Sequence, residues 1–143
     1  MSVHLIRNLH ALVELRSTEI DKLEADVAAK ASICARYRSS VVKLADLVAG
    51  SGSSGALALH LSANCGDYKQ SVMQLAATHE VDLTLHEAEL AHTKAALHAA
   101  WARRAALAQV LAETEGALHA ARQARERRQH DELATQLWLR GQP

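Results

Sequence analysis

The sequence of 143 residues contains no Phe, only 3% aromatic residues and a single Pro, which is its last residue. A compact core built on large rings is therefore not expected, and no internal Pro interrupts a helix. Two Cys, at positions 34 and 65, form neither a CxxC motif nor a disulfide framework. This sparse use of cysteine predicts a reducing compartment, the cytoplasm.

Neither sign of charge is in excess, because 16 basic side chains stand against 16 acidic ones. Proteins dedicated to nucleic acids or anionic membranes neutralise phosphates with a large cationic surplus, so neither partner is expected. Long hydrophobic runs are also missing. The longest uncharged stretch, residues 47–66, contains Gly, Ser, Asn and His, and Arg7 and Glu14 interrupt the apolar N-terminus. The sequence therefore predicts no direct membrane insertion and no signal peptide.

Ala, Leu, Arg, Glu and Lys fill 76 of the 143 positions, which is typical of long helices and coiled coils. In the first third of the chain, alternating steps of three and four residues connect thirteen positions, of which eleven are uncharged. They are Ile6, Leu9, Val13, Arg16, Ile20, Leu23, Val27, Lys30, Cys34, Tyr37, Val41, Leu44 and Val48. This seam of six heptads predicts a coiled-coil helix over about residues 2–49. Arg16 and Lys30 on the seam either specify the register or extend toward solvent.

A Gly/Ser-rich segment, residues 50–55, favours a turn after this helix. A short helical segment is expected over residues 56–63, and Asp67 is a candidate N-cap for a second helix that runs to about residue 140. Leucines at seven-residue intervals, interrupted at Arg104, give this helix a thinner seam; they are Leu83, Leu90, Leu97, Leu111 and Leu118. The predicted fold is all-α, an elongated antiparallel two-helix coiled-coil hairpin that forms a single domain over residues 1–143.

The helix lengths predict where pairing ends. With an apex near residue 58, residue 3 would face about residue 113, and residues 119–140 would project as a lone basic helix. The candidate partner-binding residues in this part are Arg122, Arg125, Arg127, Arg128, Leu133, Leu137 and Trp138. Arg122, Arg125 and Arg128 share one face of a helix. Docking to an acidic protein partner, a solvated basic face and a frayed terminus are the alternatives for this segment.

Residues that could carry catalysis or bind metals are present but lack the required spacing. No two of the nine His are three or four residues apart, so no helical pair can chelate a metal. His79, Asp82 and His86 share a face and are interpreted as seam residues. The Gly/Ser segment lacks the Lys of a phosphate-binding loop, and a two-helix hairpin offers no concave pocket for a nucleophile. We predict a protein that is not an enzyme, with no catalytic residue, cofactor or metal.

Several short motifs follow one another along the whole chain. They are Tyr37-Arg38, Tyr68-Lys69-Gln70, Trp101 with Arg103 and Arg104, and Arg125-Glu126-Arg127-Arg128-Gln129-His130-Asp131-Glu132-Leu133-Ala134. Together with the length, the early start of the seam and the Gly/Ser break, their order resembles the FliJ/YscO-type central-stalk proteins of flagellar and virulence-associated type III protein export. The chain differs from these proteins in lacking Phe and in its many His, so the flagellar and virulence systems both stay open.

The resemblance implies a hairpin that stands in the central pore of a hexameric export ATPase, with both chain ends pointing into the ring. It also implies that the protein promotes assembly or activity of the ATPase, contacts the export-gate membrane protein and, as in some members, binds export chaperones. Such a protein is cytoplasmic, peripheral to the inner membrane through the export apparatus, and a monomeric hairpin. The arginines and Trp138 then become the expected ring contacts, and residues 51–55 a candidate gate contact.

Other functions are compatible with parts of the sequence. A homodimeric coiled-coil scaffold, or a secretion regulator that binds chaperones, would pair the first helix with its own copy. A reversible binder of lipid or polymer surfaces needs a wide apolar face with flanking Lys, whereas the first helix has a narrow stripe. A nucleic-acid-binding helix is disfavoured by the zero net charge.

Overall fold

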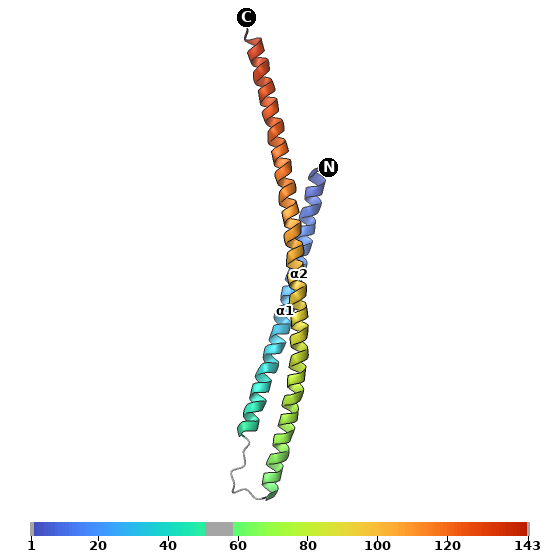
Figure 1. Ribbon diagram of the computed structural model, residues 1–143, viewed down its shortest axis with the longest axis vertical. Helices are drawn as coiled ribbons and strands as arrows, with labels where there is room; N and C mark the ends of the chain where they lie inside the picture. The colour runs from blue at the N-terminus through green and yellow to red at the C-terminus, as the bar shows by residue number, and fades with distance from the viewer. Residues whose placement is uncertain (1, 51–58, 143) are drawn as a thin grey trace. The chain divides into compact units, whose positions relative to one another are not determined.

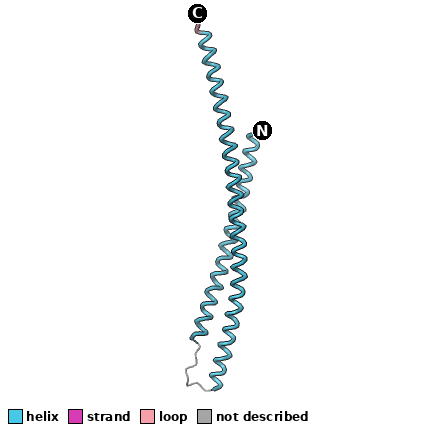
Figure 2. The backbone as a smooth tube through the Cα atoms, in the orientation of Figure 1, coloured by secondary structure: helices cyan, strands magenta, loops and turns pink. Residues whose placement is uncertain are grey.

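The structure, a computed structural model, describes residues 2–50 and 59–142. Helix α1 is Ser2–Gly50 and helix α2 is Leu59–Arg140 (Figure 1). Within the two described ranges there is no strand, and only Gly141 and Gln142 lie outside a helix (Figure 2). The helices pack antiparallel: near the N-terminus of α1, His10 contacts Glu115 and Ser17 contacts Arg104. Further along α1, Lys30 contacts Thr93 and Arg38 contacts Glu87. The prediction of an all-α two-helix hairpin is confirmed.

The helix boundaries match the prediction for α1 and differ for α2. Helix α2 begins at Leu59, eight residues before the expected start, so Asp67 is not an N-cap. Its carbonyl instead accepts a hydrogen bond from Ser71 Oγ at 3.0 Å inside the helix. Gly66 costs a helix only about 1 kcal/mol relative to Ala, which neighbouring helix-forming residues offset. The expected turn and the candidate gate residues 51–55 lie outside the described residues.

Contacts within the chain group into two compact units. Unit 1 comprises Met1–Ile20 and Ala99–Pro143, and unit 2 comprises Asp21–His98. Each unit contains one part of α1 packed against one part of α2. The expectation of a single domain over the whole chain stays a prediction.

The predicted seam of α1 is confirmed in both units, because all thirteen of its positions are buried or half-buried. In unit 1 it packs with the α2 seam around a core of Leu9, Ile20, Ala100 and Leu111. In unit 2 the core residues are Cys34, Val72, Leu90 and Leu97. Burying a leucine side chain in this way contributes about 1.5–3 kcal/mol relative to leaving it exposed.

The α2 seam extends further toward the N-terminus of α2 than Leu83, the first of the leucines at seven-residue intervals. Val72, Ala76 and His79 continue the same alternation of steps and are buried or half-buried. Toward the C-terminus, Arg104 replaces a leucine and stays exposed, but its Nε donates to Ser17 Oγ at 2.8 Å. A polar bond between the helices thus takes the place of an apolar contact at that layer of unit 1.

The two charged residues on the α1 seam behave differently. In unit 2, Lys30 Nζ donates to Thr93 Oγ1 at 2.8 Å and lies 3.3 Å from Asp26. Thr93 is buried, so this bond links the helices at a defined level and favours a role in register. In unit 1, Arg16 instead donates to Glu19 on its own helix at 2.8 Å. This bond, with a weaker attraction from the nearby cations, holds the pKa of the Glu19 carboxyl below its usual value.

The register of the pairing differs from the expected one by about one heptad. His10 was expected near residue 106 and instead donates to Glu115 at 2.8 Å, in unit 1. Lys30 was expected near residue 86 and instead binds Thr93, in unit 2. The physical reason is that the seams, and not the midpoint of the turn, set the pairing. A shift of seven residues is the smallest that keeps both seams facing each other.

Candidate protein-docking site

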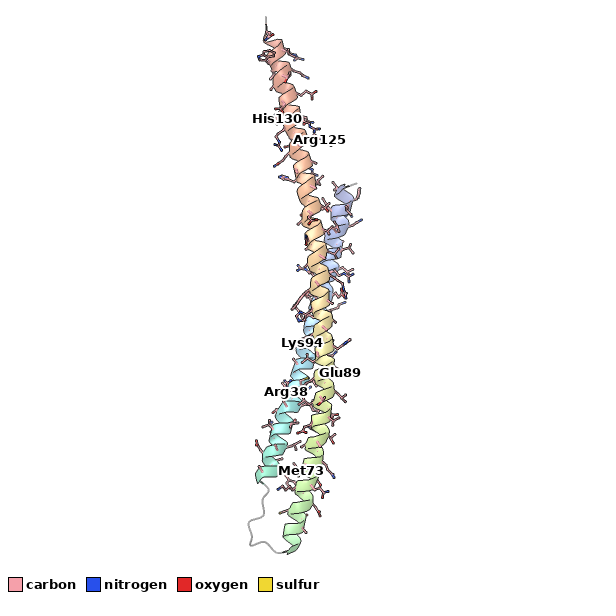
Figure 3. The ribbon with its side chains drawn as sticks, in the orientation of Figure 1. Arg38, Met73, Glu89, Lys94, Arg125 and His130 are labelled. Carbon is pink, nitrogen blue, oxygen red and sulfur yellow. The ribbon has the colours of Figure 1, made fainter. Side chains whose placement is uncertain are left out.

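The C-terminal part of α2 continues past the N-terminus of α1 within unit 1 (Figure 1). Arg122 still lines a pocket together with Val3 and Ile6 of α1. Residues 123–140, here called the free segment, are all exposed except the half-buried Ala124. Arg125 and His130 extend from this segment into solvent (Figure 3). At 1.5 Å per residue, the free segment is about 27 Å long.

The candidate arginines lie on more than one side of α2. Because each residue advances about 100° around a helix, Arg122, Arg125 and Arg128 lie on one broad face and Arg127 lies on another. Arg127 Nε donates to the Gln123 carbonyl at 3.4 Å. Arg122, Arg125 and Arg128 form no ion pair with any other described residue. Their positive charges therefore remain available to a partner.

Four large apolar side chains near the end of α2 face solvent. Leu133, Leu137, Trp138 and Leu139 are 56–68% exposed, whereas the seam leucines Leu97 and Leu111 are 6–8% exposed. Leu139 was not among the candidates, although its position beside Trp138 in the sequence carries the same signal. Helix α2 persists to Arg140, after which the Gly141 amide donates to the Leu137 and Trp138 carbonyls. Exposed apolar groups are common at interaction sites, which makes this end of α2 a candidate docking site.

A depression lies where α1 begins beside α2, in unit 1. Its lining residues, here called the junction pocket, are Val3, Ile6, Glu115, Leu118, His119 and Arg122. Two of the polar groups are already bonded, since His10 donates to Glu115 at 2.8 Å and His119 lies 3.0 Å from Gln123 Nε2. Arg122 belongs to both the junction pocket and the set of candidate arginines. The sequence could not reveal this pocket, because it depends on the register.

The His-Asp face singled out in the sequence lies in unit 2. Tyr37 of α1 contacts His79 and His86 of α2, with ring centroids 5.5 and 4.9 Å apart. Both His are half-buried on the seam, as the interpretation as seam residues requires. Among the residues that the structure describes, no group of three His, Cys, Asp or Glu is placed to hold a metal ion.

The comparison with protein families identifies the chain. The model of the flagellar FliJ protein family matches residues 6–143. The chain belongs to the FliJ family. No curated protein and no solved structure matches it in the corresponding comparisons.

Membership of the FliJ family makes the chain a component of flagellar protein export, and its partners belong to that export apparatus. The resemblance inferred from the sequence is thereby confirmed, and of the two systems left open the family is the flagellar one. In the described ranges, neither helix contains a segment with the length and apolar character that a membrane span requires.

Proposed function

We propose that this FliJ-family chain is the central stalk of the hexameric export ATPase. In this role it catalyses no reaction itself. The free segment enters the ring and promotes its assembly and activity, while other parts of the chain contact the export-gate membrane protein and export chaperones. The protein is then held at the cytoplasmic side of the inner membrane through the export apparatus.

The observation that carries the proposal is the distribution of apolar side chains around the free segment. Leu137, Trp138 and Leu139 are consecutive, so they point in three directions about 100° apart. A flat partner would cover one face of the helix and leave at least one of these side chains in water. A partner that surrounds the helix covers all three. A ring with a central pore has this geometry.

The charges of the free segment support the same arrangement. Four arginines of the free segment stand against three carboxylates, and Arg122 adds a positive charge directly before it, so this part of a neutral chain is locally positive. Because the arginines lie on several sides of α2, they attract acidic groups from several directions. Complementary charge of this kind speeds association and orients the partner. Leu137, Trp138 and Leu139, here called the apolar tip, then provide the buried apolar contact.

The proposal is tested by reversing Arg122, Arg125 and Arg128 to Glu. Hexamer formation and ATP hydrolysis by the export ATPase from the same source are followed as the purified chain is added. We expect wild type to stimulate both, and the variant to need a roughly tenfold higher concentration at low salt. The difference should shrink as salt rises.

The matched control reverses Lys22, Arg36 and Lys94, which are exposed cations outside the free segment. It changes the net charge by the same amount and should stimulate like wild type. Circular dichroism checks that both variants keep their helicity. Equal stimulation by the arginine variant and wild type would rule out docking through the arginines, and no stimulation by wild type would rule out the stalk.

A further inference from the structure

The junction pocket combines an apolar floor with a positive charge, the Arg122 guanidinium. Val3 and Ile6 of α1 and Leu118 of α2 provide the apolar surface, and Val3 is 57% exposed. The Glu115 carboxylate at the same place already accepts a hydrogen bond from His10. Arg122 forms no ion pair with another described residue. The pocket therefore complements an apolar group that carries a negative charge close by.

The position of the junction pocket on α2 also limits which groups can bind there. The α2 face that packs on α1 passes through Leu111 and Leu118 and, at helical spacing, continues to Arg122 and Arg125. Within unit 1, Val3 and Ile6 of α1 line the junction pocket together with this face of α2. A side chain seated in the pocket would therefore lie against the same face of α2. On this face, Arg122 and Arg125 follow directly after the apolar residue Leu118.

We propose that the junction pocket binds an apolar side chain of the export ATPase that has a carboxylate as a near neighbour. The apolar side chain packs on Val3, Ile6 and Leu118, and the carboxylate pairs with the Arg122 guanidinium. This inference rests on the proposed function, because it takes the ATPase as partner. It adds a second contact, at the start of α1, to the one made by the apolar tip of the free segment.

Two single variants probe the pocket, each with a matched control on the same protein. Val3→Ser removes the exposed apolar contact, and Leu5→Ser makes the same kind of change at an exposed position outside the pocket. Arg122→Glu reverses the charge in the pocket, and Arg7→Glu reverses one at an exposed position of α1 that does not line the pocket. The dissociation constant for the purified export ATPase is measured for each. We expect a roughly tenfold rise for the pocket variants, equal to about 1.4 kcal/mol, and less than about twofold for the controls.

Crosslinking then identifies the occupant. A photoreactive p-benzoylphenylalanine is placed at position 3 and, as control, at position 5, and the crosslinked ATPase peptide is sequenced. We expect a crosslink from position 3 to a peptide with an apolar residue close to Asp or Glu. A crosslink to a peptide without an acidic residue would overturn the inference.

A third variant separates this inference from the stalk proposal. Leu137→Ser with Trp138→Ser removes the apolar tip of the free segment and leaves the pocket unchanged. If this variant weakens ATPase binding while Val3→Ser, which does not touch the candidate arginines, binds like wild type, the pocket inference is overturned and the stalk proposal stands. If wild type does not bind the ATPase, both are overturned.

Discussion

At the scale of single residues, the polar groups on the seams have distinct roles. Lys30 crosses to Thr93 in unit 2, whereas Arg16 pairs with Glu19 on its own helix in unit 1. The sequence left both possibilities open for each residue, because a charged side chain on a seam has the same pattern whether it crosses or not. Which outcome occurs depends on the neighbour across the interface, and therefore on the register.

Glu19 gives unit 1 a pH-dependent contribution to stability. Its pKa is lowered in the folded chain, chiefly by the hydrogen bond from Arg16. The contribution is therefore present above the pKa of an unfolded Glu, about 4.3, and is lost as pH falls through the lower folded value. We expect the thermal midpoint of wild type to fall more between pH 6 and pH 3 than that of Glu19→Gln. Glu14→Gln, at an exposed position without an ion pair to a described residue, should follow wild type; parallel curves for wild type and Glu19→Gln would contradict this assignment.

At the scale of helices, heptad spacing predicted the seam of α1 at every position and most of the seam of α2. The spacing could not predict the register, because after a shift by one heptad the seam residues of α1 still face seam residues of α2. It also missed the early start of α2, because Gly66 and Asn64 resemble a helix boundary in sequence but cost little within a long helix. The candidate arginines and apolar residues could be predicted from the sequence, because only the presence of the helix had to be known. The junction pocket could not be predicted, because its lining depends on the register of the two helices.

The contrast between the two faces of α2 can be measured in unit 2. Leu97 is 6% exposed on the seam, and Leu85 is 60% exposed on the opposite side. We expect Leu97→Ala to lower the free energy of unfolding by about 2–5 kcal/mol, because it removes buried methyl groups and leaves a cavity. Leu85→Ala should change it by less than about 0.5 kcal/mol. Urea denaturation of both variants checks this, and a similar loss for both would mean that the assigned seam is incorrect.

At the scale of the whole molecule, the chain folds back on itself and each seam already has a partner. Seam patterns do not reveal whether that partner is intramolecular, so the homodimeric scaffold was an alternative from sequence alone. In the structure, residues 6–48 of the α1 seam are covered by α2 in unit 1 and in unit 2. The described seam residues of α1 are thus buried or half-buried against α2 within the same chain.

We therefore expect the purified chain to be a monomer of 15.5 kDa. Light scattering coupled to gel filtration, at concentrations from the micromolar to the millimolar range, checks this directly. A mass of twice that value that persists on dilution would favour the dimeric scaffold. Repeating the measurement with Leu137→Ser and Trp138→Ser shows whether any weak association arises from the exposed tip instead.

Within unit 1, we expect the pairing of α1 with α2 at Val3 to limit how far a surrounding partner can move along α2. A single α-helix with its side chains is about 10–12 Å in diameter, and at Val3 a second helix is added to that width. An opening that fits one helix can slide along the last 27 Å or so of α2 and then meets the end of α1. Removing seven residues from the N-terminus of α1 moves this limit by about 10 Å, and adding a heptad there moves it back by the same amount. We therefore expect the length of α1 to determine how far such a partner can move along α2.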